Sequence, residues 1–194
     1  MRRLIRQTAA HLTRLGRAGL GRVCRYRFGR ALFGASARDE VSVQLLGPDT
    51  LGYWEDYLHV PRGAIRFPSP GTYSALAIAR GRVVGHVSVF RQWERPDVEV
   101  PGWWLTGLEV APSWRGRATG RRLVCCVLDA WRASETSQDL YLVVHRRNSP
   151  AVRLFESVGF HVFHNEDWER RLARVYSPHR TGSWAYQIMA WARE

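Results

Sequence analysis

The amino-acid sequence predicts an α/β fold, in which a mixed, mostly antiparallel sheet is flanked by helices and preceded by a basic helical N-terminal extension. Three observations predict it. Short runs rich in Val, Ile, Leu and aromatic residues, separated by Gly and Pro, indicate strands. Later segments with apolar residues at helical spacing indicate helices. The strand-rich part precedes the part in which strands and helices alternate, which is typical of a mixed sheet with crossovers.

The length of 194 residues suits one domain that buries a core, and the 45% hydrophobic content is ordinary for such a domain. We expect a strand over 41–46, a helix over 48–59, a loop over 60–71, a hairpin of 73–79 and 83–90, a second loop over 91–102, a strand over 103–110, a helix over 121–135, a strand over 140–144, a helix beginning near 149, and short strands near 160–163 and 184–191.

Helix boundaries come from capping residues. Pro48 and Pro150 suit the first turn of a helix, where the missing N–H is no loss. Ser149 is the expected cap before Pro150. Gly159 is expected to end that helix, because glycine adopts the left-handed backbone that often follows one.

The first 38 residues differ from the rest. They hold ten arginines and no acidic residue, so most of the net charge of +12 lies there. We expect domain boundaries of 1–38 for an Arg-rich helical extension and 39–194 for the main domain. Three roles for the extension stay open: packing on the domain or pairing with a second copy, contact with an anionic membrane or an acidic carrier protein, and contact with nucleic acid, which is favoured least.

Composition excludes several classes. No apolar run approaches the ~18 residues that a membrane-spanning helix needs. The basic start has no apolar core behind it and is a poor secretory signal. Three cysteines, of which Cys125 and Cys126 are adjacent in an apolar helical run, form neither a disulfide framework nor a zinc pattern. We therefore expect a cytoplasmic protein without a metal site.

The most informative segment runs from Val110 to Gly120 and reads as a strand end, a turn of small residues and a helix start. Small side chains let a ligand approach the backbone closely. The unpaired N–H groups of a helix start attract anions such as a pyrophosphate. Nearby positive charge comes from four arginines, namely Arg115, Arg117, Arg121 and Arg122.

A second segment, from Asn148 to Phe160, follows the expected strand 140–144. Together the two segments resemble the GNAT acetyltransferase superfamily. Its phosphate loop, Arg/Gln-x-x-Gly-x-Gly/Ala, matches Arg115, Ala118 and Gly120, with Ala118 where Gly is usual. Its second motif, Asn-x-x-Ala-x-x-Leu-Tyr-x-x-x-Gly-Phe, is matched by Asn148, Ala151, Leu154, Gly159 and Phe160, with Phe155 where Tyr is usual.

The resemblance implies the GNAT fold over about 41–191 and acyl transfer from acetyl-CoA, or another acyl-CoA, to an amine. By the same resemblance, the strand before the turn pairs with pantetheine and the turn holds the pyrophosphate. The positions expected to bind the acyl donor are Leu108, Val110, Arg115, Gly116, Arg117, Ala118, Thr119, Gly120, Arg121, Asn148, Ala151 and Phe155.

The chemistry needs a base, because the amine must lose a proton before it attacks directly. Glu109 lies on the strand beside the expected thioester and is the candidate; its alternative role is to order the strand or pair with an arginine. Phe155 cannot supply the leaving thiolate with a proton. Tyr176 is the candidate replacement, with Tyr141 as a weaker one. Alternatively the thiolate, with a pKa of roughly 8.5–9, leaves unaided, or the protein binds acyl-CoA without turnover.

The expected partner is a small-molecule or peptide amine. By the family resemblance, we expect the amine to contact the first helix and the loops over 60–71 and 165–182. These segments carry many aromatic residues and arginines. An apolar, aromatic or acidic acceptor suits these groups. A variant of the function is transfer of a longer acyl chain from CoA or an acyl carrier protein docked on the extension.

Overall fold

The computed structural model describes residues 40–61, 71–92, 100–134, 138–176 and 185–191, and they belong to two compact units. The first unit includes Gly107–Ser134 and the residues up to Ser88, and the second includes Val89–Thr106 and the residues after Ser134. The expected extension over 1–38, with Cys24, lies outside the described residues, as do 62–70 of one expected loop and 93–99 of the other.

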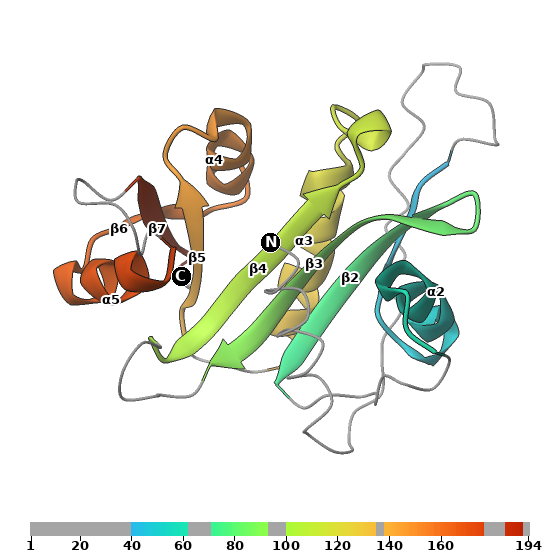
Figure 1. Ribbon diagram of the computed structural model, residues 1–194, viewed down its shortest axis with the longest axis horizontal. Helices are drawn as coiled ribbons and strands as arrows, with labels where there is room; N and C mark the ends of the chain where they lie inside the picture. The colour runs from blue at the N-terminus through green and yellow to red at the C-terminus, as the bar shows by residue number, and fades with distance from the viewer. Residues whose placement is uncertain (1–39, 62–70, 93–99, 135–137, 177–184, 192–194) are drawn as a thin grey trace. The chain divides into compact units, whose positions relative to one another are not determined.

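The described residues form a seven-stranded sheet in the order β1-β2-β3-β4-β5-β7-β6 (Figure 1). The strands are β1 (Ser42–Leu45), β2 (Thr72–Ala79), β3 (Arg82–Gln92), β4 (Gly102–Val110), β5 (Leu140–His145), β6 (His161–Phe163) and β7 (Tyr186–Trp191). Antiparallel pairing joins β1 to β2 and β7 to both β5 and β6, whereas β4 and β5 pair in parallel. The expected mixed, mostly antiparallel sheet is confirmed.

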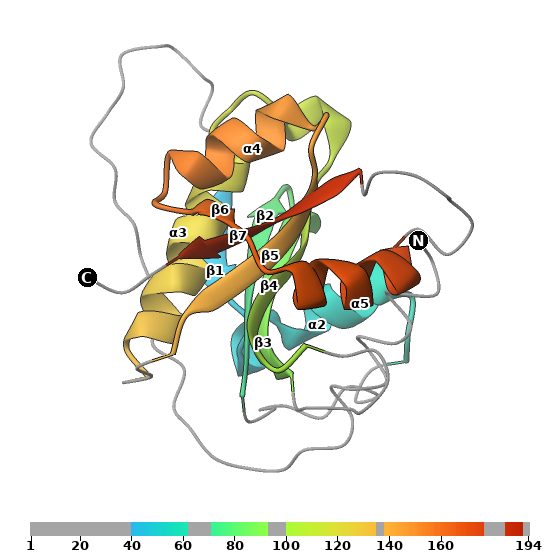
Figure 2. The same cartoon turned by 90° about the vertical axis from the view of Figure 1, so that its left-hand side faces the viewer.

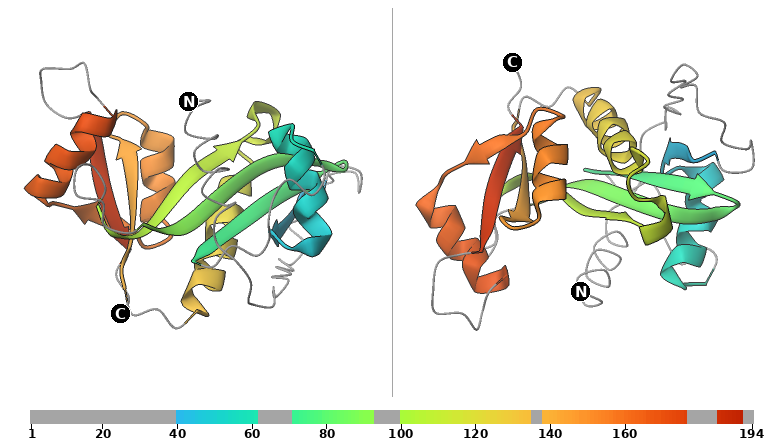
Figure 3. Two further views of the ribbon diagram at one scale, coloured as in Figure 1. Left: turned by 60° about the horizontal axis from the view of Figure 1, so that its bottom comes forward. Right: turned by 90° about the horizontal axis from the view of Figure 1, so that it is seen from above.

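In the first unit, helices α2 (Pro48–Leu58) and α3 (Thr119–Arg132) lie on opposite faces of the strands (Figure 3). Side chains alternate along β2, so Leu76 faces one way and its neighbours Ala75 and Ala77 the other. Leu76 packs with Trp54 of α2 in a buried cluster. The two alanines, both fully buried, give α3 room to pack closely against β2.

Helix α3 ends earlier than expected. Its apolar stripe is buried as the sequence indicates, with Leu123, Val124 and Val127 completely inaccessible. The expectation that it extends to position 135 was wrong, because it stops at Arg132. Both the N–H and the hydroxyl of Ser134 donate to the carbonyl oxygen of Trp131, which closes the last turn. On the same helix Cys125 is half-buried and Cys126 buried, and both are free thiols.

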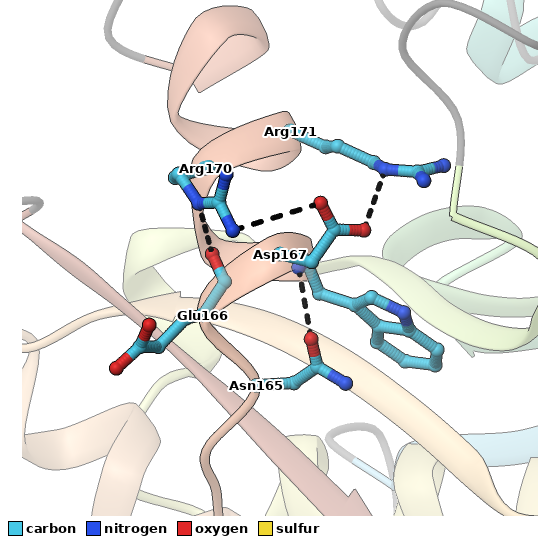
Figure 4. A network of polar contacts seen from close by, with 6 residues as sticks. Asn165, Glu166, Asp167, Arg170 and Arg171 are labelled. Carbon is cyan, nitrogen blue, oxygen red and sulfur yellow. Dashed lines mark hydrogen bonds and ion pairs between the residues drawn. The ribbon is translucent and has the colours of Figure 1, made fainter.

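In the second unit, α4 (Ser149–Glu156) and α5 (Glu166–Tyr176) cover opposite faces of the strands (Figure 2). Helix α5 was not expected. It begins directly after Asn165, whose side-chain oxygen accepts a 3.1 Å hydrogen bond from the N–H of Trp168. Asp167 pairs with Arg171 at 2.9 Å and with Arg170 at 4.0 Å, one turn along the helix (Figure 4).

The apolar side of α5 fixes it to the sheet. Leu172 is buried with Ile188 of β7, and Trp168 packs against this cluster. Rings from three strands lie around Trp168, since its centroid is 4.8 Å from that of Tyr141, 5.5 Å from that of Phe163 and 5.9 Å from that of Trp104. Among the described helices, none is long and apolar enough to cross a membrane.

The cap of α4 corrects another expectation. Asn148, rather than Ser149, is the N-cap, and its side chain accepts a hydrogen bond from the N–H of Ala151. Helix α4 ends at Glu156, and Gly159 lies beyond it in a left-handed conformation with φ of 98°. A side chain there would collide with Trp191, since an added Cβ would lie 2.8 Å from its Nε1 atom.

Candidate functional site

The turn after β4 belongs to the first unit and is built from local hydrogen bonds. A single 3-10 turn, Pro112–Trp114, follows the strand. The hydroxyl of Thr119 donates to the carbonyl oxygen of Trp114 at 3.2 Å, and Thr119 is almost completely buried. Thr119 therefore holds the turn against the start of α3, and its side chain is not available to a ligand.

The start of α3 lacks a capping side chain. Its N-cap is Ala118, and no side chain of the described residues caps this end of the helix. Gly116 has open space around it, since nothing lies within 4 Å of a Cβ added there. Orphan N–H groups at a helix start carry partial positive charge, so an anion can approach the backbone here.

Ala118 adopts a conformation that the sequence did not predict. Its φ is 57° and its ψ 9°, in the left-handed region, where a methyl group is unfavourable. Because the backbone is left-handed here, alanine in place of the glycine that the family motif usually carries places strain in the turn.

The four arginines of this segment divide into two pairs. Nε of Arg115 donates to the carbonyl oxygen of Val110 at 2.9 Å, and Nη2 of Arg122 donates to that of Val41 at 2.9 Å. These two cations are engaged with the backbone. The guanidinium of Arg117 lies 5.1 Å from the ring centre of Trp114, and Arg121 is exposed. Arg117 and Arg121 are therefore the cations best suited to meet a phosphate.

Glu109 lies one residue before the end of β4 with its side chain exposed. The hydroxyl of Tyr57, on α2, donates a long hydrogen bond of 3.5 Å to Oε2 of Glu109. Partial burial, followed by the negative charge of Glu109 and this hydrogen bond, raises the pKa of Tyr57 above its ordinary value. Tyr57 thus keeps its proton and remains a donor to the carboxylate at neutral pH.

The backbone beneath Glu109 is held closely to β3. A Cβ added at Gly85 would lie 2.7 Å from the carbonyl oxygen of Glu109, so only glycine allows this approach. The N–H of Ala111 donates to the carbonyl oxygen of Val84 at 2.8 Å. On β4 itself, Gly107 has a φ of 66°, which interrupts the regular strand two residues before Glu109.

His86 is a titratable residue of this region that the sequence analysis did not select. It lies on β3, buried, with its ring centre 5.1 Å from that of Trp54 and 5.4 Å from that of Tyr57. Burial lowers the pKa of His86, and the charge of Glu109 acts in the opposite direction. The sequence did contain a signal that could have identified His86. It is a lone histidine in the apolar run 83–89, on a strand next to that of Glu109.

The remaining predicted site residues belong to the second unit. Asn148 and Ala151 bond to each other at the start of α4, and both are occupied in capping. Phe155 is buried and meets Phe160 edge-on at 5.7 Å. Tyr176 is the last residue of α5, and its side chain is not described.

The predicted positions thus form two groups, each described within its own unit. Leu108, Glu109 and Val110 share the end of β4 with the turn and helix start that follow, and residues 115–121 complete this group. The second group is the start of α4. Within the described part of the chain, no cluster of His, Cys, Asp or Glu side chains has the composition of a metal site.

Comparison with known families agrees with this architecture. A model of the acetyltransferase (GNAT) family matches residues 41–160, which is more than half of the chain. The protein belongs to the GNAT acetyltransferase family. No curated protein matched the chain in sequence.

Solved structures share the fold at low sequence identity. A GNAT-family acetyltransferase from Streptococcus pneumoniae is 14% identical, with 78% of this chain and 98% of that chain covered and a TM-score of 0.50. The aminoglycoside N-acetyltransferase AAC(6')-Iy in complex with CoA is 17% identical, with 68% and 94% covered and a TM-score of 0.51.

A putative streptothricin acetyltransferase from Bacillus anthracis, in complex with acetyl coenzyme A, is 13% identical with a TM-score of 0.49. The match covers 65% of this chain and 65% of that protein, so the chain spans about two thirds of its length.

Proposed function

We propose that the protein is an N-acyltransferase that moves an acetyl group from acetyl-CoA to an amine by direct attack in a ternary complex. The observation that carries the proposal is the uncapped start of α3, with open Gly116 and the exposed cations Arg117 and Arg121 beside it. These features suit a pyrophosphate. Membership of the GNAT family supports the same donor.

The end of β4 supplies the proposed chemistry. The lone pair of the neutral amine attacks the thioester carbonyl carbon, the carbon–sulfur bond breaks, and the thiolate leaves. Glu109 is the proposed base, since a carboxylate both attracts an ammonium group and accepts its proton. A backbone N–H at Val110 is the proposed partner of the carbonyl oxygen as negative charge develops on it.

Release of the thiolate needs no proton donor on α4 in this proposal. Phe155 carries no hydroxyl, and it is buried against Phe160. A thiol has a reference pKa of about 8.5, so the thiolate is a good leaving group near neutral pH. For release that is assisted by a proton, Tyr176 is the proposed donor to the thiolate.

Phe155 favours one alternative class of protein, a binding module without catalytic activity. A GNAT-like module that binds acyl-CoA without turnover would need no hydroxyl at position 155. Transfer of a longer acyl chain, from CoA or a carrier protein, is a variant that concerns the extension over 1–38. Removing 1–38 should then slow transfer from a carrier and leave transfer from CoA unchanged.

Labelled acetyl-CoA and a panel of amines test the proposal, with calorimetry of CoA binding alongside. We expect turnover with at least one amine. Glu109→Gln should lower kcat/KM by about 10²–10⁴-fold while CoA binds equally well. Glu40→Gln, at an exposed position before β1, is the matched control and should not change the rate. Tight CoA binding without turnover would favour the binding module, and absence of CoA binding would rule out both.

A further inference from the structure

His86 is a buried titratable side chain with an exposed fraction of 8%. Within the described part of the chain, its Nδ1 atom has no hydrogen-bond partner. Leaving a buried polar atom unpaired costs about 1–3 kcal/mol, so such an atom calls for a reason. Val87 and Val89 on the same strand are fully buried, and His86 is the titratable residue of the run 83–89.

Two elements face His86 with titratable groups. Helix α2 presents Tyr57, whose ring packs against the imidazole while its hydroxyl bonds to Glu109. Strand β4 presents Glu109, the charged side chain that acts on His86. Trp54 contacts both rings: it lies 5.1 Å from the His86 ring and stacks on Tyr57, parallel within 12° and 5.4 Å away. The rings of Trp54 and His86 together hold Tyr57 in place.

Strand β4 places a glycine beside the ring of His86. At Gly107 a Cβ would lie 3.5 Å from Nε2 of His86, within van der Waals contact. The positive φ of Gly107 disfavours any other residue there. A glycine therefore stands where a side chain would otherwise lie against the imidazole.

This inference rests on the proposed acyl transfer. We propose that His86 is a positioning residue for Glu109: packed against Tyr57, it holds the phenol that addresses the carboxylate, and its neutral form leaves that carboxylate free to accept the proton of the amine. An imidazolium in the same place would attract the carboxylate and make it a weaker base. The proton of the amine goes to Glu109, and the nitrogen lone pair goes to the acyl carbon.

The pH profile of kcat/KM is the first test. In the wild type, the acid side should become steeper by one proton where His86 titrates. In His86→Gln that extra step should disappear, and kcat above it should stay within about tenfold of wild type. His161→Gln, at an exposed position on β6, is the control and should retain the step. An unchanged profile in His86→Gln would overturn the proposal.

Tyr57→Phe tests whether the hydroxyl of Tyr57 positions Glu109. It should lower kcat more than it raises KM, because Glu109 loses its donor and not its charge, and it should keep the His86 step. An unchanged kcat would show that the hydroxyl of Tyr57 does not position Glu109.

An NMR titration of the His86 ring in the free protein needs no turnover. Removing the charge in Glu109→Gln should shift the midpoint of His86 downward, and Glu40→Gln should leave it in place. An unmoved midpoint in Glu109→Gln would refute the coupling. If no amine is acetylated but the midpoint moves, the proposed function fails and the pairing of His86 with Glu109 stands.

Discussion

Nε of Arg115 donates a 2.9 Å hydrogen bond to the main-chain carbonyl oxygen of Val110, the last residue of β4. The family resemblance assigns Arg115 to the acyl donor, yet in this structure the side chain ties the turn to the strand. Arg117 and Arg121 carry no such backbone bond among the described contacts. The arginines therefore have separable effects.

Arg115→Ala should lower the free energy of unfolding by about 0.5–1.5 kcal/mol, the usual worth of one hydrogen bond. Arg117→Ala should change the free energy of unfolding by no more than about 0.5 kcal/mol, as surface substitutions usually do. It should weaken CoA binding and make that binding less dependent on salt concentration. Urea unfolding and calorimetry at two salt concentrations measure both. Equal loss of stability in the two variants would contradict this division.

Ala118→Gly should stabilise the protein by about 0.5–1 kcal/mol. At a φ of 57° the backbone favours glycine, so the substitution relieves strain in the folded state. This relief exceeds the stability that is lost because glycine gives the unfolded chain more conformational freedom. The matched control is Ala133→Gly at the other end of α3, where φ is −65°. That change should not stabilise the protein. Urea midpoints of the two variants moving in the same direction would refute the argument.

Gly159→Ala should destabilise the protein by about 2 kcal/mol or more. The new methyl would meet Nε1 of Trp191 at 2.8 Å, and that atom donates to the carbonyl oxygen of Val158 at 3.1 Å. Gly81→Ala shares a positive φ but has open space around it, so it measures the backbone strain alone. Thermal unfolding should rank Gly159→Ala well below Gly81→Ala, and similar losses would exclude the steric contribution.

The sequence predicted the strands and the two motif helices because their signals are local. Apolar runs, prolines at helix starts and the small-residue turn each act within a few residues. Helix α5 was missed although Asn165 and three acidic residues mark its start, because aromatic and charged residues there were interpreted as an acceptor loop.

Details of the candidate site depended on tertiary contacts. Nothing in the sequence places Arg122 on the carbonyl of Val41, 81 residues away. The left-handed backbone of Ala118 likewise contradicts the ordinary preference of alanine. Glu109 was chosen from the motif, but its neighbours Tyr57 and His86 come from other elements, and only the fold brings them near.

Acid should destabilise the protein through His86. A histidine in the unfolded chain takes up a proton near pH 6.5, and burial lowers the pKa of His86 below that value. Between the two pKa values the unfolded state binds more protons, so the free energy of unfolding falls as pH decreases from about 6.5. Above about 6.5 this contribution is fully present and constant. His86→Gln should flatten this dependence in urea unfolding at a series of pH values, and exposed His161→Gln should not.

Phe155→Tyr tests whether α4 has a place for the hydroxyl that the family motif usually carries. Phe155 is 5% exposed and meets Phe160 edge-on, so an added hydroxyl without a partner should lower the free energy of unfolding by about 1–3 kcal/mol. Phe163→Tyr, at a half-buried position, is the control and should lose less, because its hydroxyl reaches water more easily. Urea unfolding with and without CoA separates the outcomes. Phe155→Tyr that is as stable as wild type, and that also raises kcat, would show that the hydroxyl has a partner and that release of the thiolate does depend on a proton donor there.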